Sequence, residues 1–247
     1  MATLFPTIGV KDSRTGHGGG TAPPSSGGGG GGPEGNGGPD YLERLRRARL
    51  GMAVALAAIV MLFVAFTSAY IVRRGLPTLD EPSGQYVRDW LQVNLPMQLL
   101  LVNTLILLVS SLTMELARRQ ITRQAALAPV QSIPGVSIGR ERILPWLPVT
   151  VLLGSGFLVG QWLAWQELEN RGFAMATSPS SSFVYLLTAM HAVHLIGGVV
   201  ALLYAETITL LRRPVEARRI VIDVTAWYWH FVTVLWLYLF ALLVFVR

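Results

Sequence analysis

Apolar residues gather in five long runs along the chain, separated by short polar segments. The runs cover approximately residues 50–72, 91–116, 143–165, 183–211 and 224–246. A bilayer core of about 30 Å is crossed by roughly 20 apolar residues in helical form, and each run reaches that length. The pattern predicts an all-α polytopic membrane protein, with a five-helix transmembrane bundle formed by residues 41–247.

The N-terminal segment has a different composition. It contains the glycine-rich stretch GGGTAPPSSGGGGGGPEGNGGP. Such a segment buries too little apolar area to offset the entropy lost on ordering. We therefore predict that residues 1–40 form a disordered tail. The next segment, 41–49, carries four Arg and reads as an amphipathic lead-in whose side chains reach lipid phosphates.

Composition narrows the possible functions. Only 14% of the 247 residues are charged, against about 25% in an average globular domain. Because there is no Cys, disulfides, thiolate metal sites and Cys nucleophiles are excluded. The net charge of +6 could suggest a nucleic-acid partner, but the Arg residues flank the apolar runs and form no basic face. We expect no nucleic-acid partner.

Basic residues are unequally divided between the two sides of the predicted bundle. Fifteen of the twenty Lys and Arg fall in the tail and in the second and fourth loops, which share one side. Cytoplasmic loops carry the excess of positive charge. The count predicts a cytoplasmic N-terminus and a periplasmic or extracellular C-terminus.

Three His lie within the predicted spans, where a polar side chain is costly and is a functional hypothesis by default. His191 and His194 are spaced i, i+3 and therefore lie on one helical face. Together with His230 they could ligate a metal or haem. The alternative is that their imidazoles hydrogen-bond within the bundle or to lipid head groups, and we assign them to that structural role.

Other polar and small residues in the spans suggest helix packing rather than catalysis. Glu206 lies about 18 Å beyond His194 along the fourth helix, near its cytoplasmic end, which favours a paired or interfacial carboxylate. Gly154, Gly156 and Gly160 offer a small-residue face for close packing. We expect the neighbouring Gln161 to bond to another helix. No Ser/His/Asp set, phosphate loop or pair of midplane carboxylates is found in the sequence.

The last run contains WYWHFVTVLW, residues 227–236, with three Trp, a Tyr and a His. Indole and phenol rings are apolar in body and polar at one tip, which suits a membrane interface. At the end of the preceding run, Arg212 and Arg213 stand where anionic head groups lie, and a guanidinium suits phosphate.

These motifs carry a resemblance to a known family. AWYWHFVTVLWLYLF resembles the last helix of cytochrome c oxidase subunit III, and HAVHLIGGVVALLY resembles the helix before it. LVNTLILLVSSLTMELARR and LLGSGFLVGQ are similar to earlier helices of the family, and the order is the family's own over about residues 45–245. Five helices resemble the shorter bacterial form.

The resemblance implies an accessory, non-redox subunit of a respiratory haem-copper terminal oxidase that accepts electrons from cytochrome c or quinol. Such a subunit stabilises the catalytic subunit I, lies in a complex with subunit II, binds phospholipid and supports proton uptake. It carries no cofactor or catalytic centre, since haem and copper belong to the partner subunits. The resemblance also implies a location in the bacterial inner membrane.

The sequence departs from the family at some positions. An embedded acid of the family is matched by the apolar Ile59, which weakens a proton role at that position, and the Asp after WYWHFV is Thr233. Asp223 retains the acid before the first Trp. The residues assigned to structural, lipid or subunit contacts are His191, His194, Glu206, Arg212, Arg213, Asp223, Trp227, Trp229, His230 and Trp236.

Two other functions stay open from the residues alone. A small membrane transporter would line its path with the intramembrane His, although it would be expected to show inverted repeats, which we do not find. A haem- or metal-binding electron carrier would use His191, His194 and His230 as ligands.

Overall fold

The computed structural model describes residues 39–80, 85–87, 90, 95–131, 145–175 and 178–245, all within one compact unit, Asn36–Arg247. Its elements are α1 (Pro39–Gly75), β1 (Thr78–Asp80), β2 (Gln85–Val87), α2 (Met97–Gln131), α3 (Trp146–Asn170), α4 (Pro179–Leu210) and α5 (Val215–Phe245). All five helices are long and apolar enough to cross a membrane, which confirms the predicted architecture. The predicted tail lies outside the described residues, except that Pro39 and Asp40 begin α1.

Several helices are longer than the apolar runs that predicted them. The Arg-rich lead-in 41–49 is a continuous part of α1, and α2 runs on to Gln131. Each residue added to an existing helix adds a backbone hydrogen bond, so a helix can continue beyond its apolar stretch. The start of α2 is later than expected, at Met97. Pro96 precedes it and supplies its carbonyl to Leu100 N at 3.1 Å.

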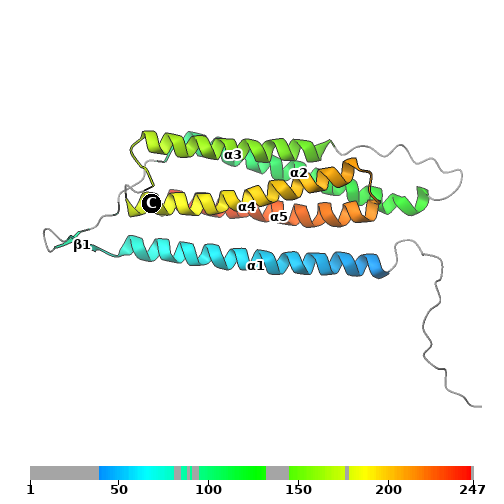
Figure 1. Cartoon of the computed structure of the whole chain (residues 1–247), viewed down its shortest axis with the longest axis horizontal. Coiled ribbons are helices and arrows are strands. Elements are labelled where there is room, and N and C mark those ends of the chain that lie inside the picture. Colours follow the sequence, from blue (N-terminus) through cyan, green and yellow to red (C-terminus); the bar gives the residue numbers. More distant parts are fainter. Residues whose placement is uncertain are drawn as a thin grey trace, which may run out of the picture. The chain divides into compact units, whose positions relative to one another are not determined.

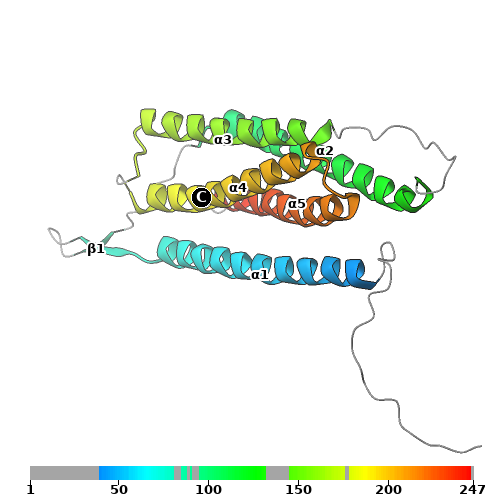
Figure 2. The same ribbon diagram turned by 45° about the vertical axis from the view of Figure 1, so that its right-hand side comes forward.

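The contacts among α2, α3, α4 and α5 close a ring of four helices. The remaining helix, α1, lies to one side of them (Figure 1). α2 contacts α3 and α5, while α4 contacts the same two helices, so α3 and α5 are diagonal partners. Among the described elements α1 contacts only α5 and α4. Figure 2 shows the same separation of α1 from the other four helices after a turn of 45°.

The buried side chains form two groups. The larger fills the ring formed by α2, α3, α4 and α5 and includes Phe157, Leu195 and Trp229. The smaller lies under α1 and is built around Phe63 and Tyr70, which pack on Leu187, Leu235, Leu239 and Leu242. The second group is what attaches α1 to the ring by apolar contact.

The connections use standard turn chemistry. β1 and β2 form an antiparallel pair between α1 and α2, with Thr78 opposite Val87. α4 begins with a capping box in which Ser178 and Ser181 each accept the other's backbone N–H. The short turn between α4 and α5 places Arg212 at a positive φ of 50°.

Candidate functional site

The indole of Trp229 holds the centre of the ring. The side chain is fully buried, and its Nε1 donates to Ser110 Oγ at 3.1 Å. A β-carbon on Gly154 of α3 would lie 2.6 Å from Trp229 Cη2, and one on Gly198 of α4 would lie 2.9 Å from Cζ3. Gly154 and Gly198 are therefore required, because a side chain at either position would overlap the indole of Trp229.

The other two Trp of the motif differ in environment. Trp236 is buried and donates from Nε1 to Thr104 Oγ1 at 2.9 Å. Its ring packs at 85° against Phe157, with centroids 4.9 Å apart. Trp227 is exposed and lies under the guanidinium of Arg49, 5.8 Å from the ring centroid. The expected interfacial aromatic set is thus divided, because two of the three indoles pack inside the bundle.

The glycine face predicted on α3 is only partly used. Gly154 contacts Trp229, and a β-carbon on Gly160 would lie 2.0 Å from Asn103 Oδ1 of α2. Gly156 has nothing within 4 Å of the position of an added β-carbon. Including Gly156 among the packing positions was wrong, because none of the described neighbouring helices approaches it, although it lies one turn from Gly160 on the same side of α3.

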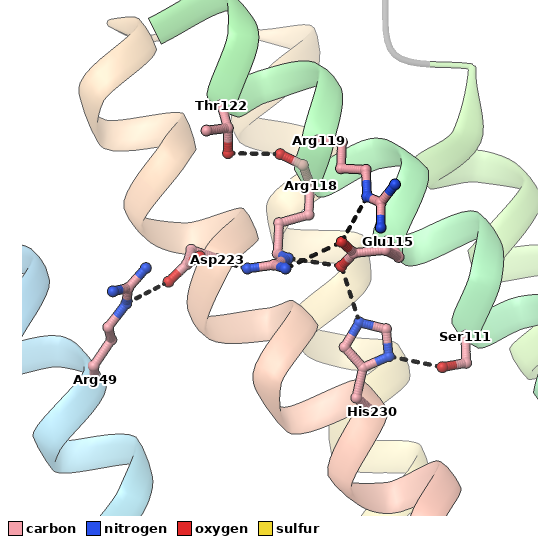
Figure 3. Close-up of polar contacts among 8 residues, drawn as sticks. All are labelled: Arg49, Ser111, Glu115, Arg118, Arg119, Thr122, Asp223 and His230. Atoms are coloured by element: carbon pink, nitrogen blue, oxygen red, sulfur yellow. Dashed lines mark hydrogen bonds and ion pairs between the residues drawn. The ribbon is translucent and has the colours of Figure 1, made fainter. Parts of the chain in front are cut away.

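His230 belongs to a polar cluster between α2 and α5 (Figure 3). Its Nδ1 lies 2.7 Å from Ser111 Oγ, and its Nε2 lies 3.5 Å from Glu115 Oε2. Glu115 also accepts hydrogen bonds from Arg118 Nε at 2.8 Å and from Arg119 Nε at 2.9 Å. One carboxylate on α2 is therefore shared by two guanidinium groups and the imidazole of α5.

Asp223 extends this cluster to the outer helix. Its carboxylate accepts a hydrogen bond from Arg49 Nε at 2.7 Å and a longer one from Arg118 Nη1 at 3.5 Å. The Asp223 side chain is only 8% exposed, while that of Arg49 is 42% exposed. Asp223 of α5 thus binds α1 and α2 together, as Figure 3 shows.

The two His of α4 do not share one environment, although they were predicted to lie on one face. His191 is fully buried, with its ring 5.0 Å from that of Trp236 and 5.9 Å from that of Phe157. His194 turns toward α1, where its ring meets Phe63 at 5.6 Å, and its Nδ1 lies 2.7 Å from Met190 O. Neither is joined to the polar cluster around His230. Over the described residues, no three His, Asp or Glu side chains gather where they could hold a metal ion.

The remaining predicted residues lie on α4, in the turn after it, and on α1. Glu206 is half-buried, and within the described part of the chain its Oε2 has no hydrogen-bond partner, so no pairing is seen for that oxygen. Arg212 and Arg213 are exposed in the turn after α4. Ile59 is half-buried against the group of apolar side chains around Phe63.

An apolar groove of about 450 Å³ lies where α1, α4 and α5 meet. Small residues form part of its walls, namely Ala48 of α1 with Gly197 and Ala201 of α4. Tyr228 also lines it and donates from its hydroxyl to His194 O at 2.8 Å. The groove is open along the outer surface of the bundle, and Arg49 follows Ala48 directly.

Two contacts of this site were not predicted from the sequence, namely that of Glu115 with His230 and that of Arg49 with Asp223. The Glu115 cluster has a local signal, because Arg118 and Arg119 follow it at i+3 and i+4, the spacing of helical ion pairs. The pairing of Arg49 with Asp223 joins residues 174 positions apart and has no local signal.

Comparison with known proteins gives consistent matches. A family model described as "Cytochrome c oxidase subunit III" matches residues 42–246. The chain is 27% identical over 206 residues to the probable cytochrome c oxidase subunit 3 of Nocardia farcinica, covering 83% of this chain and 91% of the relative. It is 26% identical, with the same coverage, to that of Mycobacterium leprae. Against the subunit 3 of Gallus gallus the identity is 29%, over 78% of this chain and 67% of the relative.

Proposed function

The chain belongs to the cytochrome c oxidase subunit III family, and we propose that it packs against the haem-copper catalytic subunit I, in a complex that includes subunit II. Membership makes it an accessory subunit of a multi-subunit respiratory oxidase, and its five apolar helices make it a multi-pass membrane protein. The observation that carries the proposal is the family match over 42–246, which takes in all five helices.

The proposed role is to support the catalytic subunit rather than to carry electrons. Two of the large aromatic side chains, Trp229 and Trp236, reach from α5 across the ring toward α3 and tie diagonal helices together. Buried indoles with satisfied N–H groups favour a single packed arrangement. A rigid bundle of this kind suits a subunit that braces a larger neighbour. Haem and copper are proposed to reside in the partner subunits.

We propose that the groove between α1, α4 and α5 takes a phospholipid acyl chain. Its walls are apolar, and its small residues leave room for a chain lying along the helices. The N-terminal half of α1 and the C-terminal end of α4 lie at the same end of the bundle (Figure 1). Arg49, Arg212 and Arg213 are therefore near that end, where guanidinium groups suit a lipid phosphate.

Support for proton uptake is proposed to come from the polar cluster around Glu115. Position 59 holds Ile, which packs with apolar neighbours, so this chain has no carboxylate there to take part in proton uptake. The ionisable side chains lie instead on α2 and α5, among them Glu115, His230 and Asp223. The excess of basic residues in the tail and in the connections after α2 and α4 supports a location of the cluster nearer the cytoplasm in the proposed inner-membrane orientation.

Extraction in a mild detergent tests the proposed assembly. A tagged copy of this chain should bring down a much larger, haem-rich subunit, and an untagged strain treated in the same way should not. The isolated chain should have no Soret band. Recovery of the chain alone, while the intact oxidase elutes separately, would contradict the assembly, and a Soret band on the isolated chain would instead support an electron carrier.

A further inference from the structure

His191 and Gln161 are buried polar side chains with hydrogen-bonding atoms that lack a partner among the described residues. Their side chains belong to residues that are 0% and 2% exposed. Among the described residues, neither ring nitrogen of His191 has a hydrogen-bond partner, and Gln161 Oε1 has none. A neutral imidazole carries one donor and one acceptor, and buried groups of this kind are almost always paired with protein or with ordered water.

Gln161 of α3 lies near the level of His191 on the neighbouring helix α4. Gln161 is four residues from both Phe157 and Trp165, so the three share one face of α3. Phe157 meets the His191 ring at 5.9 Å, and Trp165 Nε1 donates to Thr188 Oγ1 at 3.1 Å. Gln161 therefore lies between the levels of Thr188 and His191 on α4, which packs against α3.

Neighbouring polar atoms are already engaged. Trp236 Nε1, beside the His191 ring, donates to Thr104 Oγ1. Thr188 Oγ1 donates to Val184 O while it accepts from Trp165. His194 also satisfies its own ring, through Met190 O one turn back. His191 makes no such bond, because its ring is turned inward between Phe157 and Trp236.

We infer that Gln161 and His191 hold one ordered water molecule inside the bundle. A water can donate to Gln161 Oε1 and to the unprotonated ring nitrogen of His191, or accept from the ring N–H. Internal waters typically make about three hydrogen bonds to buried polar groups that are otherwise unsatisfied. The bound water gives both side chains a partner without displacing any hydrogen bond recorded around them.

The test uses the intact oxidase, in a density map that resolves water. The expected result is a peak about 3 Å from Gln161 Oε1 and from one His191 ring nitrogen. A direct contact between the amide and the ring, or two ordered side chains with no peak between them, would overturn the inference. This measurement needs no variant and is independent of assembly defects.

A second measurement tests whether Gln161 holds the water that contacts His191. With ¹⁵N-labelled His, solid-state NMR should show transfer of ¹H magnetisation from water to the ring of His191, assigned by its loss in His191→Phe. Gln161→Met keeps the length of the side chain but removes the acceptor, and it should abolish that transfer. The His194 signal, from a half-buried ring, is the internal control and should persist. Unchanged transfer to His191 in Gln161→Met would show that Gln161 does not hold the water.

Discussion

The ring of Trp229 fills the space that a β-carbon on Gly154 would need, with Cη2 only 2.6 Å from that position. The two residues come from α5 and α3, which are diagonal in the four-helix ring. A glycine in one helix thus admits an indole from the helix opposite. Three residues of the bundle, Gly154, Gly198 and Trp229, form one interlocking unit at its centre.

Gly154→Ala should destabilise the subunit. The added methyl group overlaps ring carbons that cannot move freely, and overpacking of this kind costs about 1–3 kcal/mol. We expect loss of this subunit from the purified oxidase or faster inactivation during turnover. Gly156→Ala is the matched control, because nothing lies within 4 Å of the added atom. Equal retention of the two variants would mean that the close approach of Trp229 is not limiting.

Asp223→Asn should loosen α1. The substitution removes the charge that Arg49 and Arg118 share, and because Arg49 is partly exposed the expected loss is about 1–3 kcal/mol. Limited proteolysis of the complex near the α1–α2 connection should become faster. Glu43→Gln, which breaks the exposed i, i+4 pair with Arg47, should leave the rate unchanged. If Asp223→Asn digests like the wild type, the charge of Asp223 does not limit the docking of α1.

His230→Leu should harm the subunit more than His230→Gln. Leu leaves Ser111 Oγ without its partner on α5, at about 1–3 kcal/mol, while Glu115 keeps its two Arg partners. Gln keeps a donor and an acceptor at this position. Retention of the subunit in the complex is the readout, with the partner's haem spectrum intact in both variants. Metal analysis accompanies it. An equivalent of copper, iron or zinc that is lost in His230→Gln would show that the imidazole is a ligand.

Replacing Arg212 and Arg213 by Gln should lower the amount of phospholipid retained by the complex. Each Arg near an anionic surface contributes about 1 kcal/mol of attraction. Phosphorus analysis of matched preparations measures the change. The control is Arg171→Gln, at the opposite end of the bundle, which should not alter lipid content. Unchanged phospholipid in the double variant would leave the two residues as orientation signals only.

A reporter fused after Arg247 should be active in the periplasm. Five spans place the termini on opposite sides, and the excess of basic residues assigns the N-terminus to the cytoplasm. A fusion in the turn between α4 and α5 should show the reverse activity. Cytoplasmic activity at Arg247 would contradict the orientation.

The sequence by itself determined the number of spans and the class of the protein. Apolar runs of sufficient length require helices in a membrane, because backbone polar groups must be satisfied internally there. Helix ends were less well predicted. Hydropathy marks the apolar stretch, while α1 and α2 continue through polar residues to Pro39 and Gln131.

Only the tertiary structure decided what each side chain contacts. The apolar runs surround their helices, so the pattern does not fix the rotation of a helix about its axis, and packing does. That rotation buries Trp229 but exposes Trp227, and it sends His191 into the core but His194 toward α1. The pairing of Arg49 with Asp223 likewise exists only once α1 is docked, because chain-distant charges meet through packing rather than through local spacing.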